Sequence, residues 1–400
     1  MIRCVGGDRR NDTFMASRFT VRAGQHPRRL APITVPLPEV PAGDLAVRNS
    51  ANGRVTAAQR CPEGIVFLLD ELAAGAEATF VLQVANVGGT GVQVTEGERD
   101  LDITVGGDLF TRYRYSGEGL ARPYFWPVFG PDRRQVTRAY PMVPDAPGEA
   151  RDHPHHRSIW VAYGELDGYD AWSEGPNHGS TLHVAFDEIT SGPVFGGFSE
   201  QTKWVDAFGW QLLKENRTVR IYATPTGARL MDVDLHWTFG RQDGRGRRFS
   251  LGQVHLGDTK EAGLIAVRVA SSMDAKGTGK IENAWGGANE AETWGKRAPW
   301  CDYSGPVDGE TVGIAAFDHP DNLHFPCYWH VRNYGLMGSN PWSGENFTNN
   351  PRENGATTFQ YGDELRFRYR LYIHNGDAGS ARVGEHWFNF GFPPQVKVEE

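Results

Sequence analysis

The sequence predicts an all-β protein with a small N-terminal β-sandwich, a large domain of two antiparallel sheets packed face to face, and few short helices. Glycine and proline are frequent, at 49 and 24 of 400 residues. They separate short stretches rich in β-branched and aromatic residues, which is typical of strands joined by many turns. Helical periodicity is nearly absent. These observations favour sheets over helices along almost the whole chain.

The order of segments predicts three parts. Residues 1–16 lack an apolar pattern, and we expect a disordered leader there. Four strand-like runs within residues 17–90 predict the small β-sandwich, with a structural or positioning role. The glycine-rich stretch "NVGGTGVQ" then marks a boundary. Residues 95–392 are long enough for the large double sheet, which we expect to hold the active site.

Two stretches of the large domain alternate apolar and polar residues in the manner of half-buried strands. In "MDVDLHWTF", residues 231–239, every second side chain from Met231 to Phe239 is apolar. In "ELRFRYRLYIH", residues 364–374, Leu365 to Ile373 alternate with arginines and Tyr372. Such strands are expected in antiparallel sheets with one wet face. A short helix is expected after them, within residues 374–390, with Asp377 as a possible cap.

Charge and hydropathy exclude some partners and locations. The formal net charge is −8, and no basic block is longer than a few residues, which argues against a nucleic-acid partner. No window approaches the roughly 18 apolar residues of a membrane span, and no apolar signal segment precedes the strands. The four cysteines are far apart, as expected of reduced thiols. We expect a cytoplasmic protein that does not bind membranes and that could form a homo-oligomer.

The densest cluster of chemically active residues is "RDHPHHRSIW", residues 151–160. In an extended segment His153 and His155 point to the same side, so they could offer two imidazoles to one metal ion. A third ligand would then come from His183, His255, Asp258 or Glu261. Two other interpretations remain open: a metal-free acid–base site and structural polar packing.

Three further stretches hold candidate site residues. "AYGELDGYDAWSEG" places Asp170, Trp172 and Glu174 on a glycine-punctuated loop, which suits a sugar site or an ordinary polar turn. "HLGDTKEAGLIAVRVA" places Asp258, Lys260 and Glu261 before an apolar strand. Such a cluster could pull the protonation equilibria of its members apart, form a structural ion pair, or lie on a solvated surface.

The last two stretches combine aromatic rings with polar groups. "ETWGKRAPWCDYSGP" contributes Trp294, Lys296 and Arg297, which could form a carbohydrate platform or a stiffening cation–π cluster. "FDHPDNLHFPCYWHVRNYG" contributes His319, His330 and Tyr334. The motifs of nucleotide-binding folds, zinc proteases and serine hydrolases are absent, so these functions are not expected.

Several long motifs together resemble the PmoA-like family of bacterial proteins, which has no assigned function. They include "RPYFWPVFGP", "DHPHHRSIWVAYGELDGYDAWSEG", "GDTKEAGLIAVRVA" and "WHVRNYGLMGSNPW". The resemblance implies a link to sugar catabolism, and the large domain looks similar to the galactose mutarotase-like supersandwich. Tyr163 stands where family members usually have histidine, which favours metal-free acid–base chemistry.

The residues and the resemblance together predict a carbohydrate-active enzyme that cleaves a glycoside by hydrolysis or β-elimination. We expect His156 or His153 to be the general acid and Glu261 the base, tuned by Lys260 and Asp258. The alternatives are a sugar epimerase or mutarotase, a metal-dependent oxidoreductase using His153 and His155, and a non-catalytic sugar-binding protein. No cofactor is favoured, although a divalent metal is possible. The predicted substrate-binding residues are His155, Arg157, Asp170, Trp172, Glu174, His183, Trp294, Lys296, Arg297, His319, His330 and Tyr334.

Overall fold

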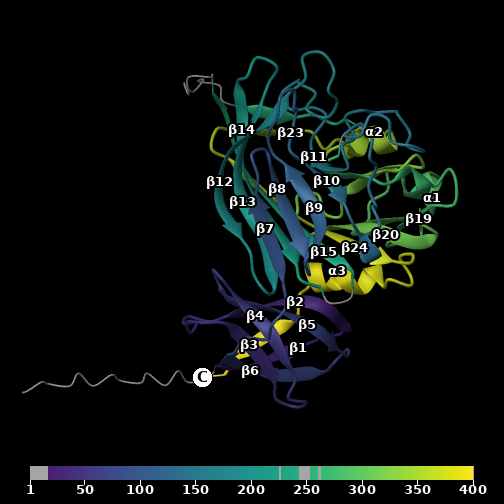
Figure 1. The fold of residues 1–400 in the computed structure, drawn as a ribbon. Coiled ribbons are helices and arrows are strands. Elements are labelled where there is room, and N and C mark those ends of the chain that lie inside the picture. Colours follow the sequence, from purple (N-terminus) through teal and green to yellow (C-terminus); the bar gives the residue numbers. More distant parts are fainter. Residues whose placement is uncertain (1–16, 225–226, 243–252, 260–262, 400) are drawn as a thin grey trace, which may run out of the picture.

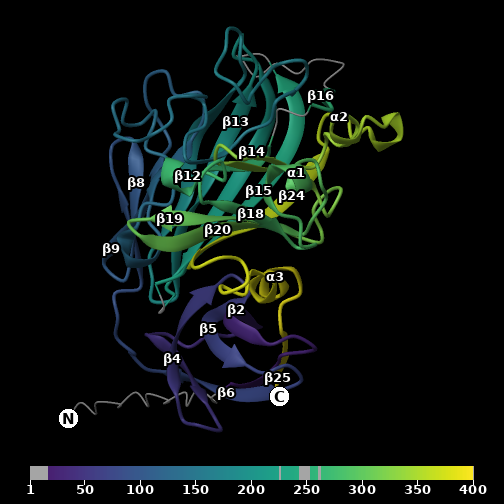
Figure 2. The same cartoon turned by 90° about the vertical axis from the view of Figure 1, so that its right-hand side faces the viewer.

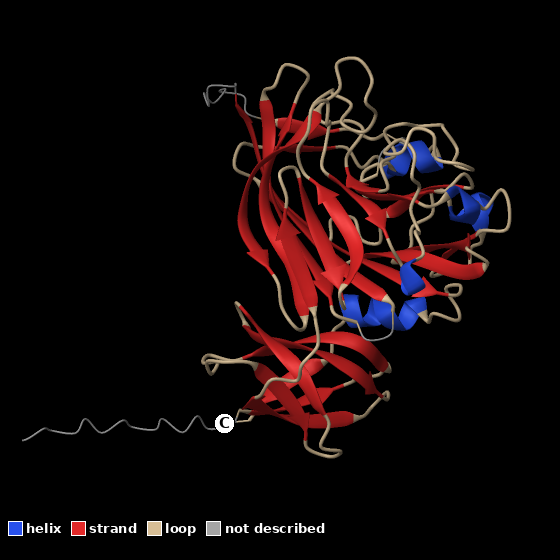
Figure 3. Ribbon diagram, in the orientation of Figure 1, coloured by secondary structure: helices blue, strands red, loops and turns tan. Residues whose placement is uncertain are grey.

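The computed structural model describes residues 17–224, 227–242, 253–259 and 263–399. The predicted leader, Lys260 and Glu261 therefore lie outside the described residues. Within the described part the chain forms 25 strands and three short α-helices, which confirms the all-β class (Figure 3). No helix in this part is long and apolar enough to cross a membrane.

The first sheet has seven antiparallel strands in the order β2-β5-β4-β3-β6-β1-β25. It curls around its own core, because Phe19 of β1 contacts Phe67 of β5 at 5.9 Å between ring centroids although three strands separate them in the sheet. The strands are β1 (Arg18–Arg22), β2 (Arg28–Pro36), β3 (Leu45–Asn49), β4 (Val55–Cys61), β5 (Gly64–Leu72), β6 (Glu77–Val84) and β25 (Gln395–Val398).

The C-terminal segment ties this sheet to the rest of the molecule. Strand β25 lies beyond the predicted end of the large domain and pairs with β1 (Figure 2). The helix before it, α3 (Val383–Gly391), lies against β2. There the buried Arg28 guanidinium donates to the carbonyl oxygens of Phe388 and Phe392 at 3.0 and 2.7 Å. The contact joins the first and last parts of the sequence.

Two eight-stranded antiparallel sheets form the large double layer (Figure 1). One has the order β21-β22-β17-β11-β10-β9-β8-β7 and comprises β7 (Val92–Glu96), β8 (Asp100–Val105), β9 (Asp108–Arg114), β10 (Tyr124–Val128), β11 (Ile159–Val161), β17 (Ile265–Arg268), β21 (Tyr328–Arg332) and β22 (Leu336–Asn340). The other has the order β12-β13-β14-β15-β24-β20-β19-β18 and comprises β12 (Ser180–Thr190), β13 (Phe195–Val205), β14 (Gln211–Tyr222), β15 (Arg229–Gln242), β18 (Lys280–Asn283), β19 (Trp300–Val307), β20 (Glu310–Asp318) and β24 (Glu364–Asn375).

The remaining elements are short. Strands β16 (Val254–Leu256) and β23 (Thr357–Phe359) pair with each other. The helices are α1 (Asn289–Thr293), α2 (Gly344–Thr348) and three 3-10 turns, η1 (Pro131–Arg133), η2 (Ser271–Met273) and η3 (Pro351–Glu353). Helices α1 and α2 lie among long loops to one side of the double layer (Figure 1).

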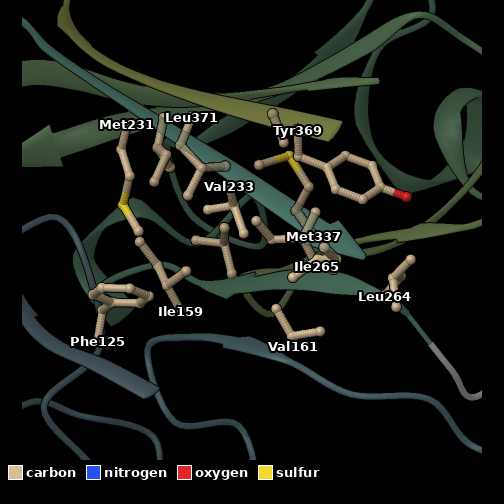
Figure 4. Close-up of a cluster of buried hydrophobic side chains, with 14 of the residues drawn as sticks. Phe125, Ile159, Val161, Met231, Val233, Leu264, Ile265, Met337, Tyr369 and Leu371 are labelled. Carbon is tan, nitrogen blue, oxygen red and sulfur yellow. The ribbon is translucent and has the colours of Figure 1, made fainter. Parts of the chain in front are cut away.

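The core fills the space between the two large sheets. Met231 and Val233 of β15 and Leu371 of β24 meet Ile159 of β11 and Ile265 of β17, and all five are buried (Figure 4). Each buried aliphatic side chain of this size contributes about 1.5–3 kcal/mol relative to an exposed one. The alternation predicted for residues 231–239 is confirmed, since polar side chains separate the buried ones along β15.

The second face of β24 differs from the prediction of a wet surface. Arg370, Tyr372 and His374 are buried there, because α3 and its preceding loop cover this half of the strand. The buried charges are paired: the Arg370 guanidinium donates to Asp232 at 2.8 Å, and Nε2 of His374 lies 2.8 Å from Asp302. Sequence alternation alone could not reveal this cover.

Candidate active site

The candidate site lies on the outer face of the sheet that contains β11, β17, β21 and β22. Along each of these strands, alternate residues enter the core between the sheets, as Ile159 and Val161 do on β11. The residue between them, Trp160, therefore faces the other way and packs with Trp172 and Leu336 in a separate cluster. By the same alternation, His330 of β21 and Arg268 of β17 lie on this outer face.

A cavity of 580 Å³ opens beside this cluster. Seven residues that the sequence singled out line it: His153, His155, His156, Asp170, Trp172, His330 and Tyr334. They come from three segments that are up to about 180 residues apart in the chain, so the fold brings together motifs that were separate in the sequence. Lining residues that the sequence analysis did not select include Ser173, Thr259, Lys276, Glu290 and Arg332.

The fully buried Arg138 holds the histidine segment in place. Its guanidinium donates to the carbonyl oxygens of Ala150, Asp152, His153 and His156 at 2.8–3.2 Å. The segment is tightly turned, since the backbone N–H of His156 donates to the carbonyl of His153 at 3.0 Å. His153 has a φ of 45°, in the left-handed region that costs a non-glycine residue about 1–2 kcal/mol. Strain of this kind is frequent at functional sites.

Asp152 links Arg138, Arg268 and His153. Its Oδ1 accepts from Arg138 at 2.9 Å and from Arg268 at 2.8 Å, and its Oδ2 lies 2.5 Å from Nδ1 of His153. Burial alone would raise the pKa of Asp152, but the hydrogen bonds from His153 and Arg268 outweigh burial and lower it to about 2. The ionised carboxylate can only accept, so Nδ1 of His153 carries a proton and Nε2 is the basic nitrogen of the neutral ring.

His156 is held as a neutral imidazole. Nη1 of Arg268 donates to its Nδ1 at 3.1 Å, and because a guanidinium cannot accept, the ring proton is on Nε2. Burial, followed by the charges of His155 and Arg268, lowers the pKa of His156 well below its usual value. Burial also lowers the pKa of His155, to about 4, with the nearby Arg122 adding to the effect. Both rings are uncharged at neutral pH.

Aromatic rings stack against one another along this side of the cavity. The His153 ring is close to both His156 and Tyr334, at 4.7 and 5.0 Å between centroids and within 15° of parallel to each, and these two rings are 6.4 Å from each other. Trp172 meets His156 edge-on at 5.6 Å. The Arg268 guanidinium lies 4.6 Å from the centre of the Tyr334 ring. The stack fixes the plane of the His153 ring.

Charged groups also line the cavity. Glu290, from α1, accepts from Arg332 at 2.9 Å and from the backbone of Asn333 at 2.7 Å. Lys276 lies over the Tyr334 ring with its Nζ 5.5 Å from the centroid. Asp170 accepts from the backbone N–H groups of Trp172 and Ser173 at 2.7 and 2.9 Å. The cavity thus combines apolar ring faces with hydrogen-bonding groups.

Arg157 and Glu174 form an ion pair next to the cavity. Arg157 donates to both carboxylate oxygens of Glu174, at 3.0 and 2.8 Å, and the buried Arg122 lies 3.5 Å from the same carboxylate. Burial would raise the pKa of Glu174, but Arg157 and Arg122 lower it overall. The ion pair fixes the end of the loop that bears Asp170 and Trp172.

The other predicted site residues lie elsewhere or support the surroundings. Asp258 accepts from the backbone of Glu345, Asn346 and Gly355 at 3.0–3.1 Å, and so holds α2. His183 lies 2.6 Å from Glu200 in a polar network with Tyr113 on another part of the sheets. Trp294 packs against Phe347 and Arg332, and Lys296 is exposed on the surface. Arg297 donates to the carbonyl oxygens of His324 and Pro326, and His319 packs against Phe390.

Metal ligation was one interpretation of the histidine cluster. The rings of His153 and His155 are 5.7 Å apart and nearly perpendicular, and Nδ1 of His153 is engaged by Asp152. Across the described ranges, no group of three or more His, Cys, Asp and Glu side chains is arranged to hold a metal ion.

The residues that sequence reasoning missed are mainly arginines and Lys276. Arg268 had a readable signal, because it is a lone charge in the apolar stretch "LIAVRVA" and a buried charge requires a partner. Arg138 and Lys276 had none, since each follows ordinary loop residues. Asp152 was within the noted motif but had no role assigned to it.

Comparisons with known proteins complete the description. No curated protein sequence matches the chain. Among solved structures, similarity is found to a protein in the glycosyl hydrolase family 38 from Enterococcus faecalis (8% identity, TM-score 0.45, 96% of this chain and 47% of that one). An alpha-mannosidase from Enterococcus faecalis V583 gives 7% identity, a TM-score of 0.44 and coverage of 96% and 46%. A polysaccharide lyase gives 12% identity and a TM-score of 0.25, and the match covers 75% of this chain and 35% of that one. The chain spans about half the length of the first two.

The family assignment comes from a match to a family model over residues 100–388. The matching model is DUF6807, so the PmoA-like assignment made from the motifs is wrong. The matched range contains all the residues that line the cavity. The chain belongs to DUF6807, a family of unknown function.

Proposed function

We propose that this protein is a carbohydrate-active enzyme that cleaves a glycoside in the 580 Å³ cavity, with His153 as the proton-transferring residue. The observation that supports this role is the 2.5 Å contact between Nδ1 of His153 and the ionised Asp152 at the cavity wall. A carboxylate in this position orients the imidazole, fixes its tautomer and stabilises the imidazolium that forms on proton uptake.

The composition of the cavity suits a sugar. The rings of Tyr334 and Trp172 can cover the apolar face of a pyranose, while Asp170, Ser173 and Glu290 can accept or donate hydrogen bonds to hydroxyl groups. His155 and His156 stay neutral, and the Nε2–H of His156 is a donor. This proposal assigns His153 the role of base that the sequence suggested for Glu261.

Two cleavage reactions begin with proton uptake by His153. In hydrolysis Nε2 takes a proton from water as the oxygen attacks the anomeric carbon, and the glycosidic oxygen leaves with a proton from an acid. In β-elimination Nε2 takes a proton from a carbon next to a carbonyl or carboxyl group, a carbon–carbon double bond forms, and the oxygen on the β-carbon leaves.

The test is an NMR time course in D₂O with the purified protein and a panel of neutral glycosides, their 3-keto forms, glycosides of uronic acids and free aldoses. We expect cleavage of at least one glycoside, and the spectra distinguish hydrolysis from elimination by the double-bond signal. Deuterium uptake or anomer exchange without cleavage would replace the proposal by epimerisation or mutarotation. No change in any compound would contradict an enzymatic role toward sugars.

A further inference from the structure

We propose that the substrate of this cavity carries a carboxylate, as uronic and aldonic acids do, and that Lys276 binds it. The inference rests on the proposed function, since it names the substrate class of the same site. Of the charged groups on the cavity wall, some already have a partner within the protein.

Most charged groups that line the cavity are engaged. Arg332 pairs with Glu290 at 2.9 Å. Asp170 accepts from the backbone N–H groups of Trp172 and Ser173 and from the Ser173 hydroxyl. A carboxylate that approached Arg332 would compete with Glu290, whereas a hydroxyl group can still donate to the remaining lone pairs of Glu290 and Asp170.

Lys276 is different. Its ammonium group lies over the face of Tyr334, 5.5 Å from the centroid. In the part of the chain that the structure describes, it has no ion pair with a carboxylate within 4 Å. The ring contact attracts the cation from one side and uses none of its three N–H donors. Lys276 is exposed on the cavity wall, so the donors are accessible to a bound molecule.

Two guanidinium groups lie near Lys276 at this end of the cavity. Arg268 lies 4.6 Å from the centre of the same Tyr334 ring, and it shares the single carboxylate of Asp152 with Arg138. Two other acids are near: Glu149 is engaged by the Ser271 hydroxyl, and burial raises the pKa of Asp274 to about 6. Two guanidinium groups thus share one carboxylate here, while Asp274, with a pKa of about 6, is mostly ionised at neutral pH and partly offsets the charge of Lys276.

A carboxylate fits this end better than a phosphate. Phosphate sites in proteins use several backbone N–H groups at a helix N-terminus, a glycine-rich loop or a free guanidinium fork. The described wall offers one ammonium group, while the guanidinium groups of Arg268 and Arg332 are paired. A single point charge matches a carboxylate, and the sugar phosphate becomes a control in the experiment.

The substrate class bears on the reaction. A carboxylate paired with Lys276 stabilises the negative charge that develops when a proton leaves the adjacent carbon. His153 would take that proton on Nε2, a double bond would form to the β-carbon, and the carbon–oxygen bond there would break as the oxygen takes a proton from water or from the Nε2–H of the imidazolium. Lys276 thus favours β-elimination over hydrolysis.

The test compares the wild type with Lys276→Met, Lys276→Arg and Lys214→Met. The last is a matched control, because Lys214 is an exposed lysine of β14 that does not line the cavity. Cleavage of a glucuronide whose O4 carries the leaving sugar, of the matching neutral glucoside and of glucose 6-phosphate derivatives is followed by NMR, and binding of free glucuronate is measured by saturation-transfer NMR.

We expect the uronide to be preferred over the neutral glucoside. Lys276→Met should lower kcat/KM for the uronide by about 10- to 100-fold, the range of one hydrogen bond to a charged group. Lys276→Arg should restore most of it, and Lys214→Met should change nothing. Preference for the glucoside or the phosphate, or an unchanged kcat/KM in Lys276→Met, would overturn the inference while leaving the proposed function standing.

The binding measurement separates the two failures. If no compound is turned over, the proposed function fails. In that case glucuronate binding by the wild type that is lost in Lys276→Met still supports a carboxylate site. Absence of glucuronate binding by a folded wild type would overturn it.

Discussion

His153 is distinguished from the other histidines of the cavity by its partner. Its Nδ1 meets an ionised carboxylate, whereas Nδ1 of His156 meets a guanidinium. A carboxylate stabilises the imidazolium form, and a guanidinium opposes it. Two histidines three residues apart are thus prepared for different tasks: one to exchange a proton, the other to stay neutral and donate.

This difference predicts how the cavity histidines titrate. Because burial and nearby cations lower the pKa of His155 to about 4 and lower that of His156 well below its usual value, both rings should remain neutral as the pH falls from 8 to 5.5. Histidine-selective ¹³C and ¹⁵N NMR, with His155→Gln and His156→Gln for assignment, measures this directly. Midpoints near 6.5 for both rings would contradict the buried, cation-flanked arrangement.

At the scale of residues, the sequence predicted the side chains that line the cavity better than the side chains that hold them in place. Seven of the candidates line the cavity. They could be selected from the sequence because the side chains of histidine, tryptophan, tyrosine and aspartate have recognisable functions wherever they occur. Arg138 and Arg268 could not be assigned, since their role depends on which carbonyl and carboxylate oxygens the fold places around them. The sequence also could not show that Asp258 binds the backbone of α2 and does not line the cavity, because this depends on the tertiary structure.

At the scale of elements, the turn over residues 150–157 depends on one buried side chain. Replacing Arg138 by Met would remove the guanidinium donor from four backbone carbonyls, of which only that of His153 keeps a backbone donor, and would remove one of two guanidinium groups from Asp152. We expect Arg138→Met to lower the free energy of unfolding by about 3–5 kcal/mol, as for loss of one member of a buried charged network. Urea unfolding measures the change.

The matched control for this prediction is Arg133→Met. Arg133 is 71% exposed and pairs with Asp108 at 3.3 Å, and such surface pairs contribute less than about 1 kcal/mol. Equal effects of the two substitutions would mean that Arg138 does not hold the segment.

The alternation of apolar and polar residues predicts the buried face of a strand where its other face is not covered. Strand β15 matches its pattern, because one of its faces is open. The helix within residues 374–390 forms, but it begins at Val383, and Asp377 instead accepts from the backbone of Ser380 in the preceding turn. The prediction of Asp377 as the helix cap is therefore wrong, since an aspartate accepts backbone N–H groups in a turn with the same side-chain oxygen that it uses at a helix N-terminus.

At the scale of the molecule, stability should depend on pH through its buried histidines. Burial lowers the pKa values of His155 and His319 to about 4, of His386 to about 3, and of His156 as well. The unfolded chain binds these protons near pH 6.5, whereas the folded chain does not. The histidine contribution is therefore complete above pH 6.5 and is lost as the pH falls toward 4.

Two buried acids act in the opposite direction. Burial raises the pKa of Asp274 and of Asp318 to about 6, so these groups favour the folded state as the pH falls through 6. The stability that the four histidines lose as the pH falls exceeds the stability that the two acids gain, so we expect a lower free energy of unfolding at pH 5 than at pH 7. Urea unfolding at both values tests this, and equal or greater stability at pH 5 would contradict it.

The central claim, that His153 transfers the proton in sugar cleavage, is tested most directly by kcat of His153→Ala on the glycoside that the wild type cleaves. His236→Ala is the control, since His236 lies on β15 outside the cavity, 3.2 Å from Glu364. We expect His153→Ala to lower kcat by about 10²–10⁴-fold, the usual contribution of a general acid or base, with folding unchanged by circular dichroism. A folded His153→Ala protein with the kcat of the control would contradict the claim.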